Sequence, residues 1–252
     1  MKIFCYDNKQ LAGIGAAAAI VDVVKNNPEA VLGLATGSSP IPMYNSLIER
    51  YKSGEVSFKN VKSVNLDEYV GLQPTHPMSY AYFMRENLFD SIDIDLANTN
   101  VPSGVSGDPA AECLRYDALI ESLGGVDVQV LGIGHNGHIA FNEPSDTFSE
   151  GTQCVTLTDS TIDANARFFD SRDDVPRYAI SMGIGAICKS KKIILIANGT
   201  DKAPILEKAL FGEVTPMVPA SILKTLPDVE VYADRDALSV VLEKHPEAVV
   251  FG

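Results

Sequence analysis

VDVQVLGIG, residues 126–134, is the most strand-like stretch of the chain, and the loop HNGHIAFNEP follows it at residues 135–144. Its Val, Leu and Ile residues form a short apolar run that ends in Gly and polar residues, as a buried strand does where it enters a loop. In an open parallel sheet, ligands bind beyond the carboxyl ends of the strands. The stretch therefore predicts a strand of such a sheet with a functional loop at its end.

The same alternation of short apolar runs and longer helical patterns extends over the whole chain. Further strands are expected at residues 2–6, 30–36, 61–66, 191–198 and 229–233. Helices are expected between Asn8 and Pro28 and at residues 39–54, 79–90, 108–125, 201–211 and 236–243. This order predicts a single α/β domain, residues 1–252, with a doubly wound, mostly parallel, Rossmann-like sheet that carries helices on both faces.

Residues 144–174 break the pattern, because they are polar, rich in Ser, Thr and Asp, and poorly periodic. Long irregular segments of compact domains often cover a binding site. We expect a mobile lid here, and a plain surface excursion is the alternative.

Composition limits the partners of the chain. The 252 residues carry a formal net charge of −13, and basic residues do not cluster. An acidic chain repels phosphate backbones, so we expect no nucleic-acid partner. An anionic substrate would have to be held by a few well-placed cations.

The four cysteines lie far apart, without a Cys-x-x-Cys pair, and no secretory signal is visible. The most apolar early stretch, residues 11–24, is too short to span a bilayer and contains Asp22. We therefore expect a buried helix there and a cytoplasmic protein with reduced thiols and no membrane partner.

Polar and Gly residues gather after four of the expected strands, at residues 36–40, 67–69, 134–138 and 198–202. The first of these loops contains Thr36, Gly37, Ser38 and Ser39. Its hydroxyls, flexible backbone and free N–H groups at a helix start suit a phosphate. An ordinary helix cap at Ser39 is the alternative.

Asp67 and Glu68 end an expected strand that is otherwise mostly apolar. Adjacent side chains of a strand point in opposite directions, so only one carboxylate need face the cleft. A poorly solvated carboxylate has a raised pKa and suits a general base. A solvated strand end is the alternative.

Gly132, Gly134 and Gly137 have the Gly-x-Gly-x-x-Gly spacing of a dinucleotide-binding loop. That fingerprint needs a helix to open at the third Gly and usually begins the first strand–helix unit. Pro144 limits any helix here to two turns, and the motif lies in the middle of the chain. Dinucleotide binding is therefore disfavoured.

His135, His138 and Glu143 are candidate metal ligands. The neighbouring glycines argue against the helix that would place both histidines on one side. Two other interpretations stay open. His138 is either a buried, hydrogen-bonded histidine or an acid–base group that Glu143 orients.

Arg167 and Lys202 are cations near the expected cleft. Lys202 stands at a helix start, where a surface Lys gains nothing from the helix dipole. Contact with a phosphate is one interpretation of each residue, and a solvated surface cation is the other.

Six stretches together resemble the glucosamine-6-phosphate deaminase family, also called glucosamine-6-phosphate isomerase. They are GLATGSSP (33–40), NLDEYVGL (65–72), HPMSYAYFM (76–84), GIGHNGHIAFNEP (132–144), NARFFD (165–170) and GTDKA (199–203). The resemblance covers nearly the whole chain. It implies a hydrolase of amino-sugar catabolism that converts glucosamine 6-phosphate and water to fructose 6-phosphate and ammonia, with no metal and no redox cofactor.

The resemblance also implies roles for individual residues. His138 would protonate and deprotonate the sugar ring oxygen, with Asn136 and Glu143 beside it. Asp67 would move a proton between C2 and C1. The phosphate would be bound by Thr36, Gly37, Ser38, Ser39, Arg167 and Lys202.

Two departures from the family pattern matter. Many members carry Asp where this chain has Asn136, so the protonation of His138 depends more on Glu143. We expect the activity to be retained, with an altered acid limb of its pH profile. Longer, allosterically activated members continue beyond the position of Gly252. We therefore expect neither their activator nor their hexamer to carry over, and the chain to be a monomer or a homo-oligomer.

Two rival functions stay open. A 6-phosphogluconolactonase resembles this family in fold and in its Gly-His loop, but it typically has Asp-Glu-Arg where this chain has Asp67-Glu68-Tyr69, and it lacks FNEP. A non-catalytic sugar-phosphate sensor would carry a DNA-binding unit. The expected first strand begins at Lys2 and the chain is acidic, which disfavours such a unit.

Overall fold

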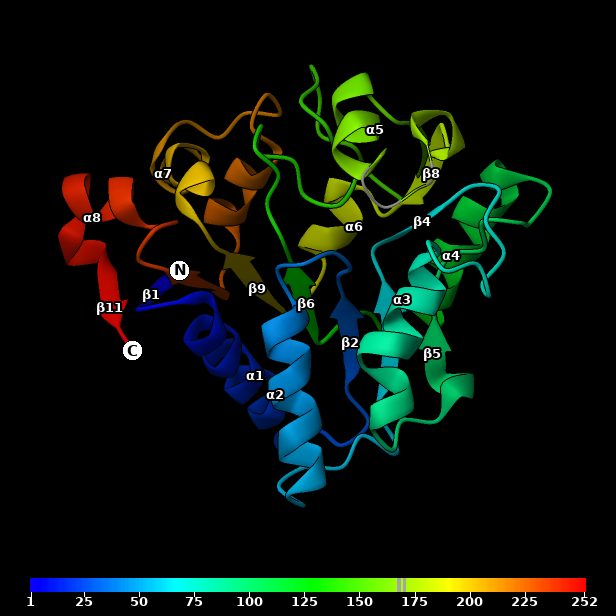
Figure 1. Cartoon of the computed structure of the whole chain (residues 1–252), viewed down its shortest axis with the longest axis horizontal. Coiled ribbons are helices and arrows are strands. Elements are labelled where there is room, and N and C mark those ends of the chain that lie inside the picture. Colours follow the sequence, from blue (N-terminus) through cyan, green and yellow to red (C-terminus); the bar gives the residue numbers. More distant parts are fainter. Residues whose placement is uncertain (167–168, 170) are drawn as a thin grey trace.

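Eight strands form the main sheet of the computed structural model, which describes residues 1–166, 169 and 171–252 (Figure 1). In spatial order they are β11 (Val249–Phe251), β1 (Lys2–Tyr6), β10 (Val229–Asp234), β9 (Lys192–Ala197), β6 (Val128–Leu131), β2 (Val31–Leu34), β3 (Lys62–Asn65) and β5 (Thr99–Asn100). Every neighbouring pair is parallel. The six expected strands are confirmed, and the short edge strands β5 and β11 were not expected.

The six expected helices are confirmed, and the short helices α5 and α6 were not expected. They are α1 (Lys9–Asn26), α2 (Ile41–Lys52), α3 (Tyr80–Asn87), α4 (Pro109–Ser122), α5 (Asp159–Asn165), α6 (Ile184–Cys188), α7 (Ala203–Phe211) and α8 (Ser239–Lys244). Short 3-10 helices are η1 (Phe89–Ser91), η2 (Leu96–Asn98), η4 (Arg172–Asp174), η5 (Thr200–Lys202), η6 (Pro219–Thr225) and η7 (Pro246–Ala248). Asn8 caps α1, because its Oδ1 accepts from the Leu11 N–H at 3.0 Å.

The direction of each crossover decides which face a helix covers. From β1 to β5 the chain moves one way across the sheet, and α1, α2 and α3 lie together in front of it (Figure 1). From β5 through β6, β9, β10 and β11 the chain moves back. Because crossovers between parallel strands are right-handed, α4, α7 and α8 cover the other face. The doubly wound fold is thus confirmed.

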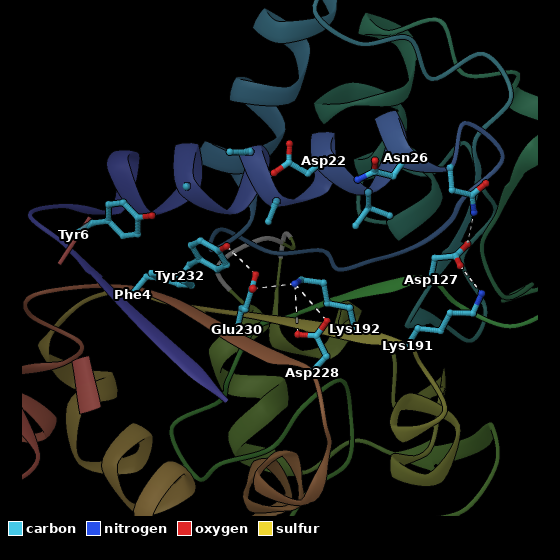
Figure 2. A pocket seen from close by; sticks show the side chains of 15 residues that line it. Phe4, Tyr6, Asp22, Asn26, Asp127, Lys191, Lys192, Asp228, Glu230 and Tyr232 are labelled. Carbon is cyan, nitrogen blue, oxygen red and sulfur yellow. Dashed lines mark hydrogen bonds and ion pairs between the residues drawn. The ribbon is translucent and has the colours of Figure 1, made fainter. Parts of the chain in front are cut away.

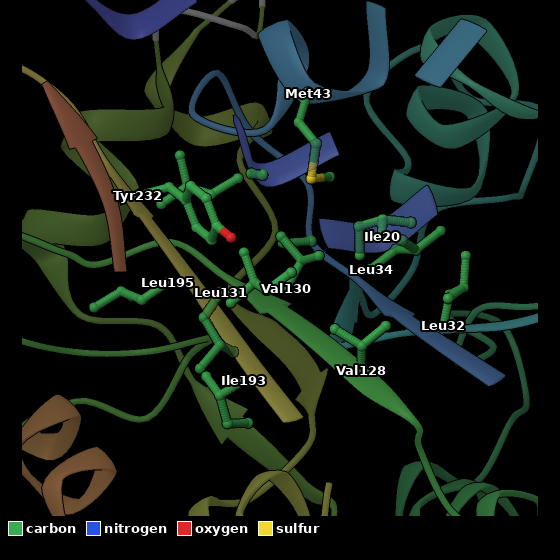
Figure 3. Close-up of a cluster of buried hydrophobic side chains, with 14 of the residues drawn as sticks. Ile20, Leu32, Leu34, Met43, Val128, Val130, Leu131, Ile193, Leu195 and Tyr232 are labelled. Carbon is green, nitrogen blue, oxygen red and sulfur yellow. The ribbon is translucent and has the colours of Figure 1, made fainter. Parts of the chain in front are cut away.

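The core lies where α1 and α2 cross the central strands. Figure 3 shows Ile20 of α1 and Met43 of α2 on the same side of the sheet as side chains of β2 and β6, among them Leu34, Val128 and Val130. All five of these side chains are at most 1% exposed. Burying a side chain of this size contributes about 1.5–3 kcal/mol, so this contact anchors the sheet.

A second, smaller sheet was not expected from the sequence. It is antiparallel and consists of β4 (Asp67–Tyr69), β8 (Tyr178–Ser181) and β7 (Gln153–Thr156). Its own apolar cluster contains Tyr69, Phe141, Leu157, Ile162, Val175 and Ala179. Within the described part of residues 144–174, β7 and α5 replace the expected irregular course. Whether this segment moves as a lid stays a prediction.

None of the helices in the described ranges combines the length and the apolar character that a membrane crossing requires. The apolar stretch at residues 11–24 lies within α1, where Ala16, Ala17 and Ile20 are fully buried, so the expected buried helix is confirmed. All four cysteines, Cys5, Cys113, Cys154 and Cys188, are free thiols.

Tyr116 of α4 ties the helix to the end of β3. Its hydroxyl accepts from the Asn65 N–H at 2.9 Å and donates to the Asn65 carbonyl at 2.7 Å, and the ring is fully buried. Tyr116→Phe leaves both backbone groups without this partner, so we expect the free energy of unfolding in urea to fall by about 1–3 kcal/mol. Tyr178→Phe, at a half-exposed ring, is the control and should change it by less than about 0.5 kcal/mol. Equal effects of the two variants would contradict this account.

Candidate active site

The strands β2 and β6 are neighbours in the sheet, but the chain leaves them in opposite directions, from β2 toward β3 and from β6 toward β9. Such diverging connections open a crevice at the carboxyl ends of the two strands. The loops at this opening are residues 35–40 and residues 132–138. These are two of the loops in which the sequence places polar and Gly residues.

The loop after β2 presents Thr36, Gly37, Ser38 and Ser39 between the strand and α2. Gly37 and Ser38 are exposed, and Gly37 has a φ of 91°, which favours glycine. The N-cap of α2 is Pro40, and no side chain caps this helix. The interpretation of Ser39 as a helix cap is therefore wrong, and the first N–H groups of α2 remain available to a ligand.

His138, Asn136 and Glu143 meet in the loop after β6. His138 Nδ1 lies 3.4 Å from Glu143 Oε1. Asn136 Nδ2 donates to Glu143 Oε2 at 2.5 Å, and Asn136 Oδ1 accepts from the His138 N–H at 3.2 Å. Burial raises the pKa of Glu143, but His138, Asn136 and Thr161 together outweigh it and lower that pKa to about 2. Glu143 is thus a carboxylate at neutral pH that can orient the imidazole.

Two glycines, Gly134 and Gly137, allow the tight backbone course of this loop. A Cβ on Gly134 would lie 2.2 Å from His138 Cε1, and Gly137 has a φ of 88°. The Gly134 N–H donates to the His138 carbonyl at 2.9 Å and closes the loop. Residues after Gly137 form a tight turn bridged from Ile139 to Asn142, so the helix that a dinucleotide loop requires is not formed there.

His135 does not join His138. Its Nε2 lies 2.6 Å from Asp201 Oδ2. Across residues 1–166, 169 and 171–252, no three His, Cys, Asp or Glu side chains gather as ligands for a metal ion. His138 and Glu143 therefore lie together without His135, and the three candidate ligands do not form one set.

Asp67 and Glu68 begin β4, directly beyond the end of β3. Asp67 is 7% exposed, so its interpretation as a solvated strand end is wrong. Burial and the charge of Glu68 raise the pKa of Asp67 to about 8. The Glu68 carboxylate accepts from the N–H groups of Tyr69, Tyr80 and Ala81 at 2.8, 3.0 and 3.0 Å and so holds the start of α3. Burial also raises the pKa of Glu68, and Asp67, with a pKa of about 8, is a carboxyl group that can exchange a proton near neutral pH.

The end of β8 contacts both Asp67 and the loop after β6. Asp67 pairs in register with Ser181. Ser181 Oγ accepts from the Phe141 N–H at 3.1 Å, and Asn142 Nδ2 donates to the Met182 carbonyl at 2.8 Å. These bonds bring the start of β4 and the loop after β6 to the same place on the sheet edge.

Lys202 lies in η5, which follows β9. Its side chain is 16% exposed, and its Nζ is 4.0 Å from Asp201 Oδ2. Burial lowers the pKa of Lys202. It is therefore not a freely solvated surface cation. Arg167, the other candidate cation, lies outside the described residues.

A protein-family model described as glucosamine-6-phosphate isomerases/6-phosphogluconolactonase matches residues 10–231. The chain belongs to this family. The expectation drawn from its sequence motifs is thereby confirmed.

Relatives of known name and structure extend this result. A glucosamine-6-phosphate deaminase of Lachnoclostridium phytofermentans is 59% identical over 216 residues, which cover 86% of this chain and 92% of that protein. One of Geobacillus sp. is 54% identical over 241 residues and 96% of each chain. A solved structure of a monomeric glucosamine-6-phosphate deaminase has a TM-score of 0.92 at 44% identity and covers 95% of this chain and all of that one. The 6-phosphogluconolactonase of Trypanosoma brucei has a TM-score of 0.75 at 16% identity over 94% of this chain and 97% of that one, and it shares the fold alone.

The expected enzyme class, a hydrolase, is wrong. The relatives are named deaminases, and the family model names glucosamine-6-phosphate isomerases first. The chemistry of the side chains agrees with this correction, because an imidazole beside a carboxylate and a protonatable carboxyl group can move protons between neighbouring atoms. Such groups are typical of an isomerase-type reaction.

Thr161 and Ser181 contact the candidate site, but the sequence did not indicate either of them. Thr161 Oγ1 donates to Glu143 Oε1 at 2.8 Å. Thr161 lies in α5, within the polar stretch that has no periodic pattern, and Ser181 is the last residue of the unexpected strand β8. A Thr-x-x-Thr spacing from Thr158 is the only local signal, and it predicts no more than a helix start.

A cavity of about 680 Å³ between α1 and the strands β1, β10 and β9 is not part of this site. Figure 2 shows two ion pairs along it: Lys192 with Glu230 at 2.9 Å, and Lys191 with Asp127 at 2.7 Å. Lys191 and Asp127 directly precede β9 and β6, so the cavity extends to the amino ends of the strands, opposite His138.

The raised pKa of Asp67 makes stability depend on pH. Between the ordinary pKa of 3.8 and about 8, the folded chain keeps the Asp67 proton that the unfolded chain has lost, so stability falls as pH rises through this window. Asp67→Asn should remove this pH dependence, because Asn does not titrate. The free energy of unfolding of the variant minus that of the unaltered chain should therefore increase from about pH 5 to about pH 8, by at most about 1.4 kcal/mol per pH unit.

Urea denaturation at several pH values measures this difference. Asp146→Asn, at an exposed carboxylate, is the matched control and should show no such trend. A difference between Asp67→Asn and the unaltered chain that stays constant with pH would contradict a raised pKa.

Proposed function

We propose that this chain is a glucosamine-6-phosphate deaminase, which converts glucosamine 6-phosphate and water to fructose 6-phosphate and ammonia through an aldose–ketose isomerisation. The names of relatives at 59% and 54% identity support the substrate. The observation that carries the proposal is the buried, protonatable Asp67, joined through Ser181 to the loop that holds His138 and Glu143. A proton shift between two carbons requires both an acid–base group beside carbon and one beside oxygen.

His138 is the group proposed to open the sugar ring. Glu143, being ionised, favours a proton on the Nδ1 side of the imidazole, 3.4 Å away. Nε2 is then the nitrogen that exchanges a proton with the ring oxygen. Asn136 holds Glu143 from its other oxygen at 2.5 Å, which limits rotation of the carboxylate.

Asp67 is the group proposed to move the proton from C2 to C1. A carboxyl group with a pKa of about 8 both accepts and donates a proton near neutral pH. Transfer of the proton to C1 leaves an imine at C2, which takes up water and releases ammonia. The proton transfer from C2 to C1 by Asp67 is therefore the step that distinguishes this reaction from simple ring opening.

The phosphate is assigned to the loop after β2 and to the loop after β9. Thr36, Gly37, Ser38 and Ser39 offer hydroxyl and N–H donors beside the start of α2, and Lys202 offers a largely buried cation. Arg167 joins this set on the sequence resemblance. Binding energy from the phosphate positions the reacting carbons, and in a chain of net charge −13 these local donors must hold the anion.

We further propose that residues 144–174 cover the bound substrate as a lid, because α5 from this segment already contacts Glu143. The chemistry needs neither a metal nor a redox cofactor. The monomeric deaminase structure supports a monomer as the working unit. A cytoplasmic location without nucleic-acid or membrane partners remains our prediction from the sequence.

The reaction is tested by ammonia release from glucosamine 6-phosphate in the presence of a chelator. We expect the unaltered chain to release ammonia and Asp67→Asn to lower kcat by about 10²–10⁴-fold, because the carbon acid–base group is lost. Asp236→Asn, at an exposed carboxylate before α8, should match the unaltered chain. A folded, unaltered chain that releases no ammonia would sink the proposed function.

Lys202→Gln tests the phosphate site. Loss of a charge-assisted contact should raise KM for glucosamine 6-phosphate by about 10–100-fold and change kcat less, because the phosphate does not react. Lys208→Gln, at an exposed Lys of α7, is the matched control. If both variants have the KM of the unaltered chain, the phosphate is bound elsewhere.

A further inference from the structure

Thr161 reaches the acid–base pair from α5. Its Oγ1 donates to Glu143 Oε1 at 2.8 Å, and the same oxygen lies 3.4 Å from His138 Nδ1. The Thr161 side chain is almost completely buried, with an exposure of 9% for the residue. Glu143 is thus held from one side by Asn136 of its own loop and from the other by a residue of the segment 144–174.

The direction of the Thr161 hydroxyl is set by the start of α5. Thr158 is the N-cap of this helix, and its Oγ1 accepts from the Thr161 N–H at 3.2 Å. The Thr158 hydroxyl also donates to Thr161 Oγ1 at 3.0 Å. A hydroxyl has a single proton to donate, and with Thr158 on its acceptor side that proton points at Glu143.

The position of α5 depends on the smaller core. Ile162, next to Thr161, is buried in the cluster that also contains Tyr69, Phe141 and Ala179. These residues belong to β4, to the loop after β6 and to β8. Packing of α5 against this cluster therefore determines whether Thr161 reaches Glu143.

We propose that Thr161 is a positioning residue, whose hydroxyl holds Glu143 in the orientation that pairs with His138 and so couples that pair to the docking of α5. With α5 docked, both oxygens of Glu143 have a donor. With α5 displaced, Oε1 loses Thr161 and the carboxylate is free to rotate away from His138. The catalytic consequence rests on the proposed function, whereas the coupling between α5 and Glu143 does not.

Three variants isolate the hydroxyl. Thr161→Val keeps the β-branched shape and removes the hydrogen bond, and Thr161→Ser keeps the hydroxyl and removes the methyl group. Thr99→Val is the matched control, because it removes a hydroxyl that donates to the Leu96 carbonyl at 2.8 Å, far from the site in the sequence and on β5. Circular dichroism first checks that each variant is folded.

Amide hydrogen exchange of residues 159–165, followed by mass spectrometry, tests the coupling without any substrate. Thr161→Val should speed this exchange about tenfold, since a hydrogen bond to a charged acceptor is lost, and Thr161→Ser should stay within about threefold of the unaltered chain. In a chain that already carries Glu143→Ala, Thr161→Val should have little further effect. Thr99→Val should leave the exchange of this segment unchanged.

Steady-state kinetics with glucosamine 6-phosphate test the catalytic consequence. Thr161→Val should lower kcat about tenfold while KM stays within about twofold, because Thr161 acts through Glu143 and does not touch the substrate. Thr161→Ser should restore most of kcat, and Thr99→Val should match the unaltered chain.

Two results would overturn the inference. Exchange of α5 in Thr161→Val that equals the unaltered chain would show that the hydroxyl does not hold α5 to Glu143. Equal loss of kcat in Thr161→Ser and Thr161→Val would assign the effect to packing of the methyl group. If the unaltered chain releases no ammonia, the proposed function fails on its own, and the exchange measurement still decides whether Thr161 couples α5 to Glu143.

Discussion

A helix that connects two parallel strands packs on the face set by the direction of the crossover, because such crossovers are right-handed. In this chain the direction reverses after β5, so one set of helices covers each face and the loops after β2 and β6 diverge. The rest of the site depends on this reversal. His138 stands in one of the two diverging loops, the phosphate-type donors stand in the other, and Asp67 and Lys202 come from neighbouring strand ends.

Three carboxyl groups at this edge have different environments, and their chemistry differs for that reason. Glu68 accepts from three backbone N–H groups and serves the start of α3. Glu143 accepts from side-chain donors and faces an imidazole, so its pKa is about 2. Asp67 is governed by burial and by the charge of Glu68, and its pKa is about 8. Pushing the pKa values of two site carboxyls apart in this way separates a permanent anion from a proton carrier. An Asp in place of Asn136 would set a second carboxylate against Glu143 and remove a donor from it.

The smaller sheet connects groups that the main sheet alone would leave independent. Its strand β8 pairs with Asp67 and, through Ser181, holds the backbone at Phe141. Its apolar cluster also carries α5, which places Thr161 on Glu143. The site therefore lies between two cores, and the segment that is expected to close over the substrate already contacts Glu143.

The main sheet and the polar loops at its carboxyl edge could be predicted from the sequence. Strands buried on both faces need continuous apolar runs, and capping residues such as Asn8 mark helix starts, so both leave local patterns. His138, Glu143 and Asp67 were selected as candidate site residues because each lies in one of the six stretches that resemble the family. The smaller sheet and several contacts of the site could not be predicted in this way. The strands β4, β7 and β8 have at most four residues each, and they exist through pairing with one another and not through local propensity. No local pattern encodes burial or partners that are distant in the chain. The raised pKa of Asp67 and the hydrogen bond from Thr161 to Glu143 depend on these, and the sequence also did not show that Ser39 does not cap α2.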